Sequence, residues 1–149
     1  MSEKNPGLSA EEKAAAKARA AELRAEAKRA KDADKAAAEA QDNRDAIEGM
    51  DGKDRELAER IAQIVAEVAP ELAPKTWYGM PTWARDGKAT VFFKAAAKFK
   101  ARYATLGFEQ GALLDEGKMW ATDRALLDID DDVAAEIAAL VRKAAGQAA

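Results

Sequence analysis

The spacing of apolar residues separates the chain into a polar N-terminal segment and a region of regular hydrophobic periodicity. Residues 9–41 are rich in Ala, Lys, Glu and Arg, which are strong helix formers, yet Leu23 is their only large apolar residue. Ser9 and Glu12 have the spacing of a helix-capping box, and Leu8 stands at the staple position beside them. The pattern predicts a solvated, fraying helical arm, which is either a plain extension or a contact for a partner or nucleic acid.

We expect the arm to occupy residues 1–41 and one folded domain to occupy residues 42–149. Two segments of that domain repeat apolar residues at helical spacing. The first ends before Pro70, and its apolar face comprises Leu57, Ile61, Ile64, Val65 and Val68. The second runs over residues 132–145, and its face comprises Val133, Ile137, Leu140, Val141 and Ala144. Aspartates precede both segments and suit helix N-termini.

Between the two predicted helices the periodicity changes to two and aromatic residues appear. Every aromatic residue of the chain lies between Trp77 and Trp120, and aromatic side chains favour strands. Asp86-Gly87 is a strong signal for a two-residue hairpin turn. Basic and apolar residues alternate over 98–105, which indicates a strand with one wet face. We expect strands over residues 76–78, 82–85, 88–94, 98–105 and 118–122.

The order helix, antiparallel strands, helix predicts an α+β fold. We expect a two-layer sandwich in which an antiparallel sheet of about five strands carries the N- and C-terminal helices on one face. The opposite face of the sheet would be open to solvent.

Composition narrows the chemistry that this fold could perform. The chain has no Cys and no His, so disulfides, zinc-finger sites and Cys or His nucleophiles are excluded. Its only serines, Ser2 and Ser9, lie in the arm, and no phosphate-binding glycine loop is present. We therefore expect a protein that is not an enzyme. A metal site would have to use carboxylates, backbone carbonyls and water, which suit hard cations and tolerate iron.

Charge is distributed in blocks, although the net charge is only −3. Residues 75–108 contain seven basic residues and one acidic residue. Residues 42–72 contain nine acidic and four basic residues, and residues 109–136 contain nine acidic and two basic residues. The predicted sheet region is therefore basic and lies between two acidic regions.

Residues 1–30 contain no apolar segment of the kind found in secretory signals, and no run of the chain approaches the length of a membrane span. We expect a cytoplasmic protein without membrane association, either a monomer or a weak dimer.

The segment Trp77-Tyr78-Gly79-Met80-Pro81 carries a family resemblance. Together with Asp86-Gly87-Lys88, Val91-Phe92-Phe93, Lys98, Tyr103 and the region of Trp120, it resembles the YdhG-like family over residues 42–145. The helical N-terminal extension is similar to that of a subgroup typical of high-GC bacteria. The resemblance implies a frataxin-like α+β sandwich and a role as an iron chaperone that delivers iron to cofactor assembly. It supplies neither catalytic residues nor metal ligands that transfer to this sequence.

Acidic residues recur every three positions from Asp42 onward. The candidate metal ligands among them are Asp45, Glu48, Asp51 and Asp54. Clustered carboxylates could hold iron weakly through oxygen, as frataxin-like carriers do. The same charges would also serve solubility and helix capping, so both interpretations stay open.

A second candidate site combines the aromatic segment with the basic strand. Its members are Trp77, Met80, Lys98, Lys100 and Arg102. If exposed, Trp77 and Met80 would form an apolar pocket or a partner surface, and if buried they would fill the core or its rim. The basic residues, expected on the open sheet face, could bind an anion, a protein or single-stranded nucleic acid, or could simply be solvated.

These observations lead to three functional hypotheses. The first is a non-enzymatic, frataxin-like iron carrier or adaptor that meets a protein partner in cofactor assembly. The second is a binding module for an anionic ligand or single-stranded nucleic acid. The third is a protein-interaction domain of unknown role.

Overall fold

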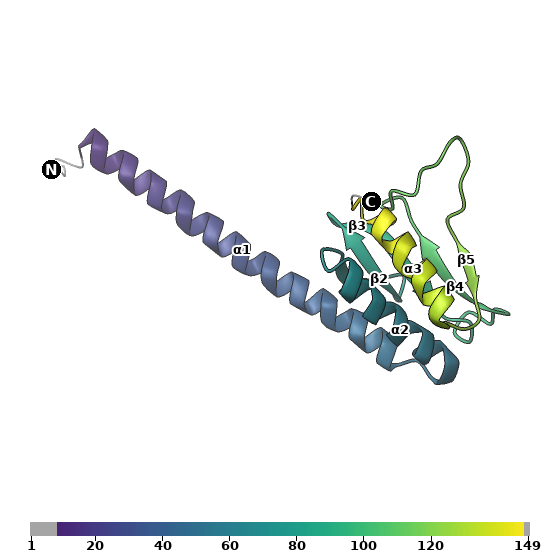
Figure 1. Ribbon diagram of the computed structural model, residues 1–149. Coiled ribbons are helices and arrows are strands. Elements are labelled where there is room, and N and C mark those ends of the chain that lie inside the picture. Colours follow the sequence, from purple (N-terminus) through teal and green to yellow (C-terminus); the bar gives the residue numbers. More distant parts are fainter. Residues whose placement is uncertain (1–8, 148–149) are drawn as a thin grey trace. The chain divides into compact units, whose positions relative to one another are not determined.

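A computed structural model describes residues 9–147. In chain order its elements are α1 (Ala10–Glu48), α2 (Gly52–Val68), β1 (Ala73–Trp77), β2 (Met80–Arg85), β3 (Lys88–Lys94), β4 (Ala104–Phe108), β5 (Arg124–Leu126) and α3 (Asp131–Ala144) (Figure 1). The chain divides into two compact units, Met1–Lys35 and Ala36–Ala149, so α1 contributes to both. None of the described helices combines the length and the apolar character needed to cross a membrane.

The part of α1 in the first unit is a solvated helix, and residues 9–35 bury no side chain. The Glu12 N–H donates to Ser9 Oγ and the Ser9 N–H donates to Glu12 Oε1, both at 3.1 Å, which confirms the predicted capping box. These bonds to Ser9, chiefly the one from its backbone N–H, hold the pKa of Glu12 below its usual range. The predicted staple residue, Leu8, lies outside the described residues.

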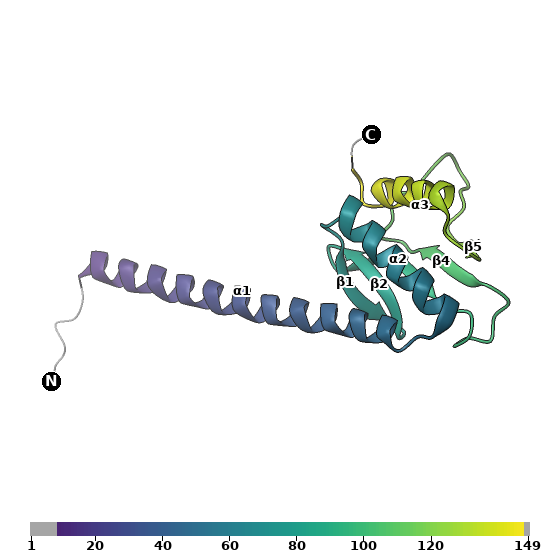
Figure 2. The same ribbon diagram turned by 60° about the horizontal axis from the view of Figure 1, so that its bottom comes forward.

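The second unit is built on one antiparallel sheet whose five strands follow chain order, β1-β2-β3-β4-β5. Two-residue turns join β1 to β2 and β2 to β3, and the second is the hairpin predicted at Asp86-Gly87. Helices α2 and α3 lie side by side on one face of the sheet (Figures 1 and 2). The predicted α+β sandwich is therefore confirmed, with β1 and β5 at the edges of its sheet.

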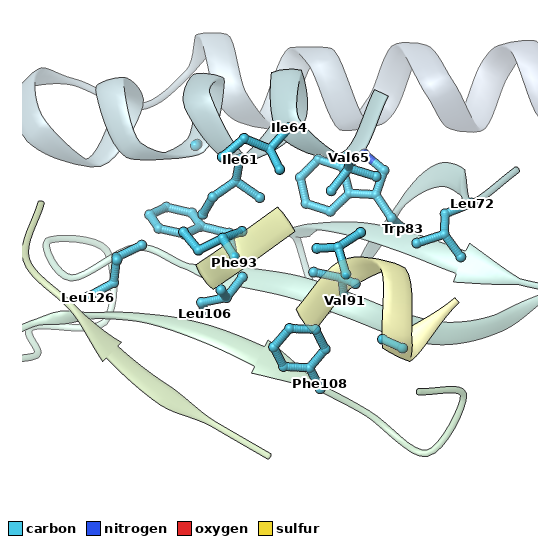
Figure 3. Close-up of a cluster of buried hydrophobic side chains, with 14 of the residues drawn as sticks. Ile61, Ile64, Val65, Leu72, Trp83, Val91, Phe93, Leu106, Phe108 and Leu126 are labelled. Atoms are coloured by element: carbon cyan, nitrogen blue, oxygen red, sulfur yellow. The ribbon is translucent and has the colours of Figure 1, made fainter. Parts of the chain in front are cut away.

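The core lies between the sheet and these helices (Figure 3). Helix α2 contributes Ile61, Ile64 and Val65, and α3 contributes Ile137 and Val141, as the helical periodicity predicts. The strands contribute alternate residues to the same core, among them Trp83, Val91, Phe93, Leu106 and Phe108. Burial of this apolar surface is the main favourable term in folding.

The last turns of α1 belong to this unit as well. Ile47 joins the core, and Asn43 Nδ2 donates to the carbonyl oxygens of Lys75 and Thr82, each at 3.0 Å. Glu39 pairs with Lys75 at 3.6 Å. The end of α1 is therefore fixed to the β1–β2 hairpin.

Two of the predicted strands are wrong. Residues 95–103 form a loop, and the strand expected over 98–105 is Ala104–Phe108 instead. Alternating charge imitates a strand there, but Lys100 has a φ of +53° and the Ala101 N–H donates to the Ala96 carbonyl at 2.8 Å, which turns the chain. The last strand lies at Arg124–Leu126 rather than over 118–122.

The face of the sheet that points away from α2 and α3 is only partly open. Phe92 alternates with the core residues Val91 and Phe93, so its ring lies on that face, yet the ring is buried. It covers Gly107, where a Cβ atom would lie 2.0 Å from Phe92 Cζ. The absence of a side chain at Gly107 therefore lets the ring lie against β4. Met80 is buried on the same face, so the prediction of a wholly solvated face is wrong.

Candidate binding surface

The turn between β1 and β2 presents an aromatic ring to solvent. Tyr78 and Gly79 have φ angles of +51° and +76°, the signs that a type I′ turn requires at its two central residues. Asn, Asp and Gly are preferred in this geometry, whereas a bulky side chain is strained. Tyr78 nevertheless occupies it, and its side chain is 81% exposed. Strain of this kind is concentrated at functional positions.

The Trp77 ring packs between the Tyr78 ring of this turn and the Phe92 ring of the sheet. It meets Tyr78 edge-on at a centroid distance of 5.0 Å and meets Phe92 at 5.5 Å. Because Phe92 rests on Gly107, a chain of aromatic contacts runs from the sheet to the exposed tyrosine. Trp77 is half-buried, and Met80 is 9% exposed. Of the two alternatives for Met80, the structure therefore has the buried one, in which the side chain packs on the sheet beside Trp77.

The loop of residues 95–103 is fastened to α2 by Asp54. The Asp54 carboxylate accepts hydrogen bonds from the backbone N–H groups of Ala96 and Ala97, each at 3.0 Å. The Lys100 N–H donates to the Ala97 carbonyl at 3.1 Å. Hydrogen bonds to a carboxylate are stronger than neutral ones, so these bonds hold the start of the loop to α2.

Four cations lie at the start of this loop or within it, and we call them the loop cations: Lys94, Lys98, Lys100 and Arg102. Three of them border aromatic rings. Lys94 Nζ and Lys98 Nζ lie 5.1 Å and 5.6 Å from the centre of the Phe99 ring. Arg102 Cζ lies 5.0 Å from the centre of the Tyr103 ring. Both rings remain exposed. Among the described residues, none of the loop cations forms an ion pair.

Lys98 connects the loop to the β1–β2 turn. Its Nζ lies so close to Gly79 that a Cβ there would be only 2.9 Å away. Residues 77–79 and 94–103 therefore form one surface, which we call the turn–loop surface. Lys98, Lys100 and Arg102 lie in a loop that leaves the end of β3, rather than on the open sheet face where the sequence predicted them.

The predicted metal ligands are only partly brought together. Asp45, Asp51 and Asp54 line one cavity of about 530 Å³, which Lys98 also lines, whereas Glu48 does not line it. Asp54 already accepts the two loop N–H groups. In residues 9–147 no group of three or more acidic side chains is arranged to hold a metal ion. The cavity is acidic, but it does not present a ready set of ligands.

The sequence identified some residues of the turn–loop surface as binding candidates and not others. It named Trp77 and three of the loop cations, but it did not single out Tyr78, Phe99 or Tyr103. The signal for Tyr78 was available, because a glycine in the second position of a two-residue connection favours a type I′ turn. The role of Asp54 had no such signal, since its partner Ala96 is 42 positions away.

No protein-family model, no curated protein and no solved structure matches the chain. The resemblance to the YdhG-like family therefore stays a prediction. A five-stranded α+β sandwich hosts many functions, so the function has to be inferred from the surface itself.

Proposed function

We propose that the protein is a non-enzymatic binding module that holds single-stranded nucleic acid on the turn–loop surface. The observation that supports this most directly is that exposed rings lie beside cations around Tyr78, Lys98 and Phe99, and that these cations form no ion pair with any residue in 9–147. Proteins bind single strands by stacking bases on aromatic rings and placing cations beside the phosphates.

The surface suits a flexible polyanion with accessible base faces better than a duplex. Tyr78 stands on a protruding turn, where its ring can stack on one base, and Phe99 and Tyr103 offer further rings along the loop. In a duplex the faces of the bases are stacked on one another, so these rings would have no base to stack on. An acidic protein would also bind the loop cations, but it would gain little from the exposed rings.

Nearby acids limit the expected affinity. Asp45, Asp51 and Asp54 line the cavity beside Lys98, and the net charge of the chain is −3. Exposed charges more than about 8 Å apart are screened at physiological salt, whereas the loop cations would meet phosphates directly. With four phosphate contacts, the logarithm of the affinity should fall with the logarithm of salt concentration with a slope of about −3.

Fluorescence anisotropy with a labelled oligothymidine tests this proposal. In the double variant Lys98→Glu/Arg102→Glu we expect the affinity to fall about 30-fold, because two attractions become repulsions. The control variant Lys88→Glu/Lys118→Glu changes the net charge equally at two exposed lysines outside the surface. It should bind within about twofold of the unmodified protein. Equal losses in the two variants, or no loss in the first, would contradict the proposal.

The iron carrier implied by the family resemblance is a second candidate, with a protein partner in cofactor assembly as its recipient. The observation that favours it is the shared cavity of Asp45, Asp51 and Asp54. Ferrous iron added anaerobically should broaden amide NMR signals of residues 45–54, and Asp45→Asn/Asp51→Asn should remove that broadening. Broadening that persists in the variant would reject these ligands, and its absence from the unmodified protein would reject the carrier.

A further inference from the structure

A separate surface lies along the β5 edge of the sheet. Strand β5 pairs only with β4, so its outer edge has no strand partner among the described residues. Between β5 and α3 lies a groove of about 440 Å³, which we call the β5 groove. Its apolar lining comprises Leu106, Leu126, Leu127, Val133, Ile137 and Leu140.

The fold leaves some of this apolar lining in water. Leu127 is 72% exposed, and Val133 and Leu140 are only partly buried. Exposed apolar groups grouped beside a free strand edge are typical of a surface that another chain covers. The edge offers main-chain hydrogen bonds, and the groove offers space for alternate side chains of an added strand.

The rim of the groove is acidic. Asp128, Asp130 and Glu136 line it, and the acidic pair Asp131-Asp132 begins α3 directly beside them. Asp128 pairs with Lys53 at 3.3 Å, whereas Glu136 has no ion pair in the described part of the chain. The uncompensated charge favours a cationic partner over an anionic one.

Arg124 also lines the groove, but it does not neutralise the rim. Its guanidinium lies 5.4 Å from the centre of the Phe108 ring and donates to the carbonyl oxygens of Ala121 and Thr122 at 3.4 Å and 3.2 Å. The arginine is therefore directed toward its own chain, and the acidic side chains set the charge that a ligand would meet.

We propose that the β5 groove binds an extended peptide of a partner protein in which apolar residues alternate with Lys or Arg. The peptide would pair its main chain with β5 and place its apolar side chains against Leu127 and the partly buried residues of α3. Successive side chains of a strand point in opposite directions, so the residues between the apolar ones would stand on the solvent side of the added strand, where only the long stems of Lys or Arg let a charge reach back to the acidic rim of the groove. A bound helix would leave the edge of β5 unpaired.

An amide NMR titration of the full chain with a synthetic peptide of alternating Lys and Val tests this inference. We expect shifts confined to residues 124–128 and 133–140. A peptide of alternating Glu and Val should leave these signals unchanged. Equal responses to the two peptides, or shifts mainly elsewhere, would overturn the proposal. Loss of the same signals on raising the protein concentration alone would overturn it too, because a second copy of the chain would then be the occupant.

Two matched pairs of variants separate apolar contact from charge. Leu127→Asn should weaken the Lys–Val peptide about tenfold, because one apolar contact is lost, whereas Met119→Asn, which replaces an 89% exposed side chain outside the groove, should not. Glu136→Lys should weaken the peptide about fivefold, whereas Asp34→Lys makes the same charge change in the arm and should not. If neither Leu127→Asn nor Glu136→Lys weakened binding of the Lys–Val peptide, the proposal would be contradicted.

Glu136→Lys also keeps the two proposals apart. Glu136 lines the β5 groove and lies outside the turn–loop surface, whereas Leu127 also borders a hollow lined by Arg102 and Tyr103. We therefore expect Glu136→Lys and Asp34→Lys to bind oligothymidine equally, so that either binding activity can fail while the other persists.

Discussion

The two ends of β2 carry turns of the same geometry and different chemistry. Tyr78-Gly79 precedes the strand with φ angles of +51° and +76°, and Asp86-Gly87 follows it with φ angles of +51° and +79°. Aspartate is a preferred residue in such a turn, so sequence and geometry agree at Asp86. Tyr78 is not preferred, and its exposed ring is held in a strained conformation. The comparison shows that the residue at Asp86 is explained by the turn geometry alone. The residue at Tyr78 opposes that geometry and places an aromatic ring in solvent.

The two turns also differ in what surrounds them. A Cβ added at Gly87 would meet no atom within 4 Å, whereas Gly79 lies against Lys98 of the β3–β4 loop. The Tyr78 ring contacts the Trp77 ring, which in turn contacts the Phe92 ring. The first turn is therefore joined to the loop that carries the loop cations and is supported by aromatic rings of the sheet, as a binding surface requires.

The largest effect should come from removing the support of the Tyr78 turn. In Gly107→Ala the new methyl group would overlap the Phe92 ring, so the ring and Trp77 above it must move. We expect the free energy of unfolding to fall by about 1–3 kcal/mol, measured by urea denaturation. Amide signals of residues 77–79 should shift while those of 86–88 stay in place. Equal shifts at both turns would show that Phe92 and Trp77 do not support the Tyr78 turn in particular.

A smaller effect is expected from replacing Tyr78 with a residue that the turn prefers. Stability should rise and oligothymidine binding should fall. Tyr78→Asn should raise the free energy of unfolding by about 0.5–1 kcal/mol, because Asn tolerates a positive φ. It should also weaken oligothymidine binding about tenfold, because one stacking ring is lost.

The mirror variant is the control for that exchange. Asp86→Tyr should lower stability by a similar amount and leave binding unchanged, because no loop cation lies beside that turn. If Tyr78→Asn bound the oligonucleotide as tightly as the unmodified protein, the tyrosine would have no part in binding.

The last effect, smaller than the tenfold change in binding and confined to stability, should come from the hydrogen bonds that hold the loop. Asp54→Asn keeps the shape of the side chain but cannot accept both loop N–H groups, so we expect a loss of about 1 kcal/mol in urea denaturation. Asp51→Asn is the matched control, since Asp51 caps α2 without a side-chain hydrogen bond. If both variants lost the same stability, the bonds to Ala96 and Ala97 would not fasten the loop.

Periodicity was sufficient where each element packs on one side only. The apolar faces of α2 and α3 repeat at helical spacing because only one face of each helix meets the sheet, and Val91 and Phe93 alternate with residues of the opposite face. The loop of residues 95–103 could not be recognised in this way. Its alternating charges satisfy the strand pattern, and what fixes it is Asp54, 42 positions from Ala96.

The residues of the candidate sites could be named from the sequence, but their positions relative to one another could not. Residue types were enough to name Trp77 and Lys98, but Lys98 reaches the β1–β2 turn at Gly79, which has no side chain to signal that contact. The acids that recur every three residues would share a face of one continuous helix. The helix instead ends at Glu48 and the next begins at Gly52, so Asp45 and Asp54 belong to different helices.

The most direct test of the turn–loop surface is an amide NMR titration of the full chain with oligothymidine, repeated for Tyr78→Asn. We expect shifts at residues 77–79 and 94–103 in the unmodified protein, reduced in the variant. Shifts confined to other regions, or identical titrations of the two proteins, would contradict the assignment of single-stranded nucleic acid to this surface.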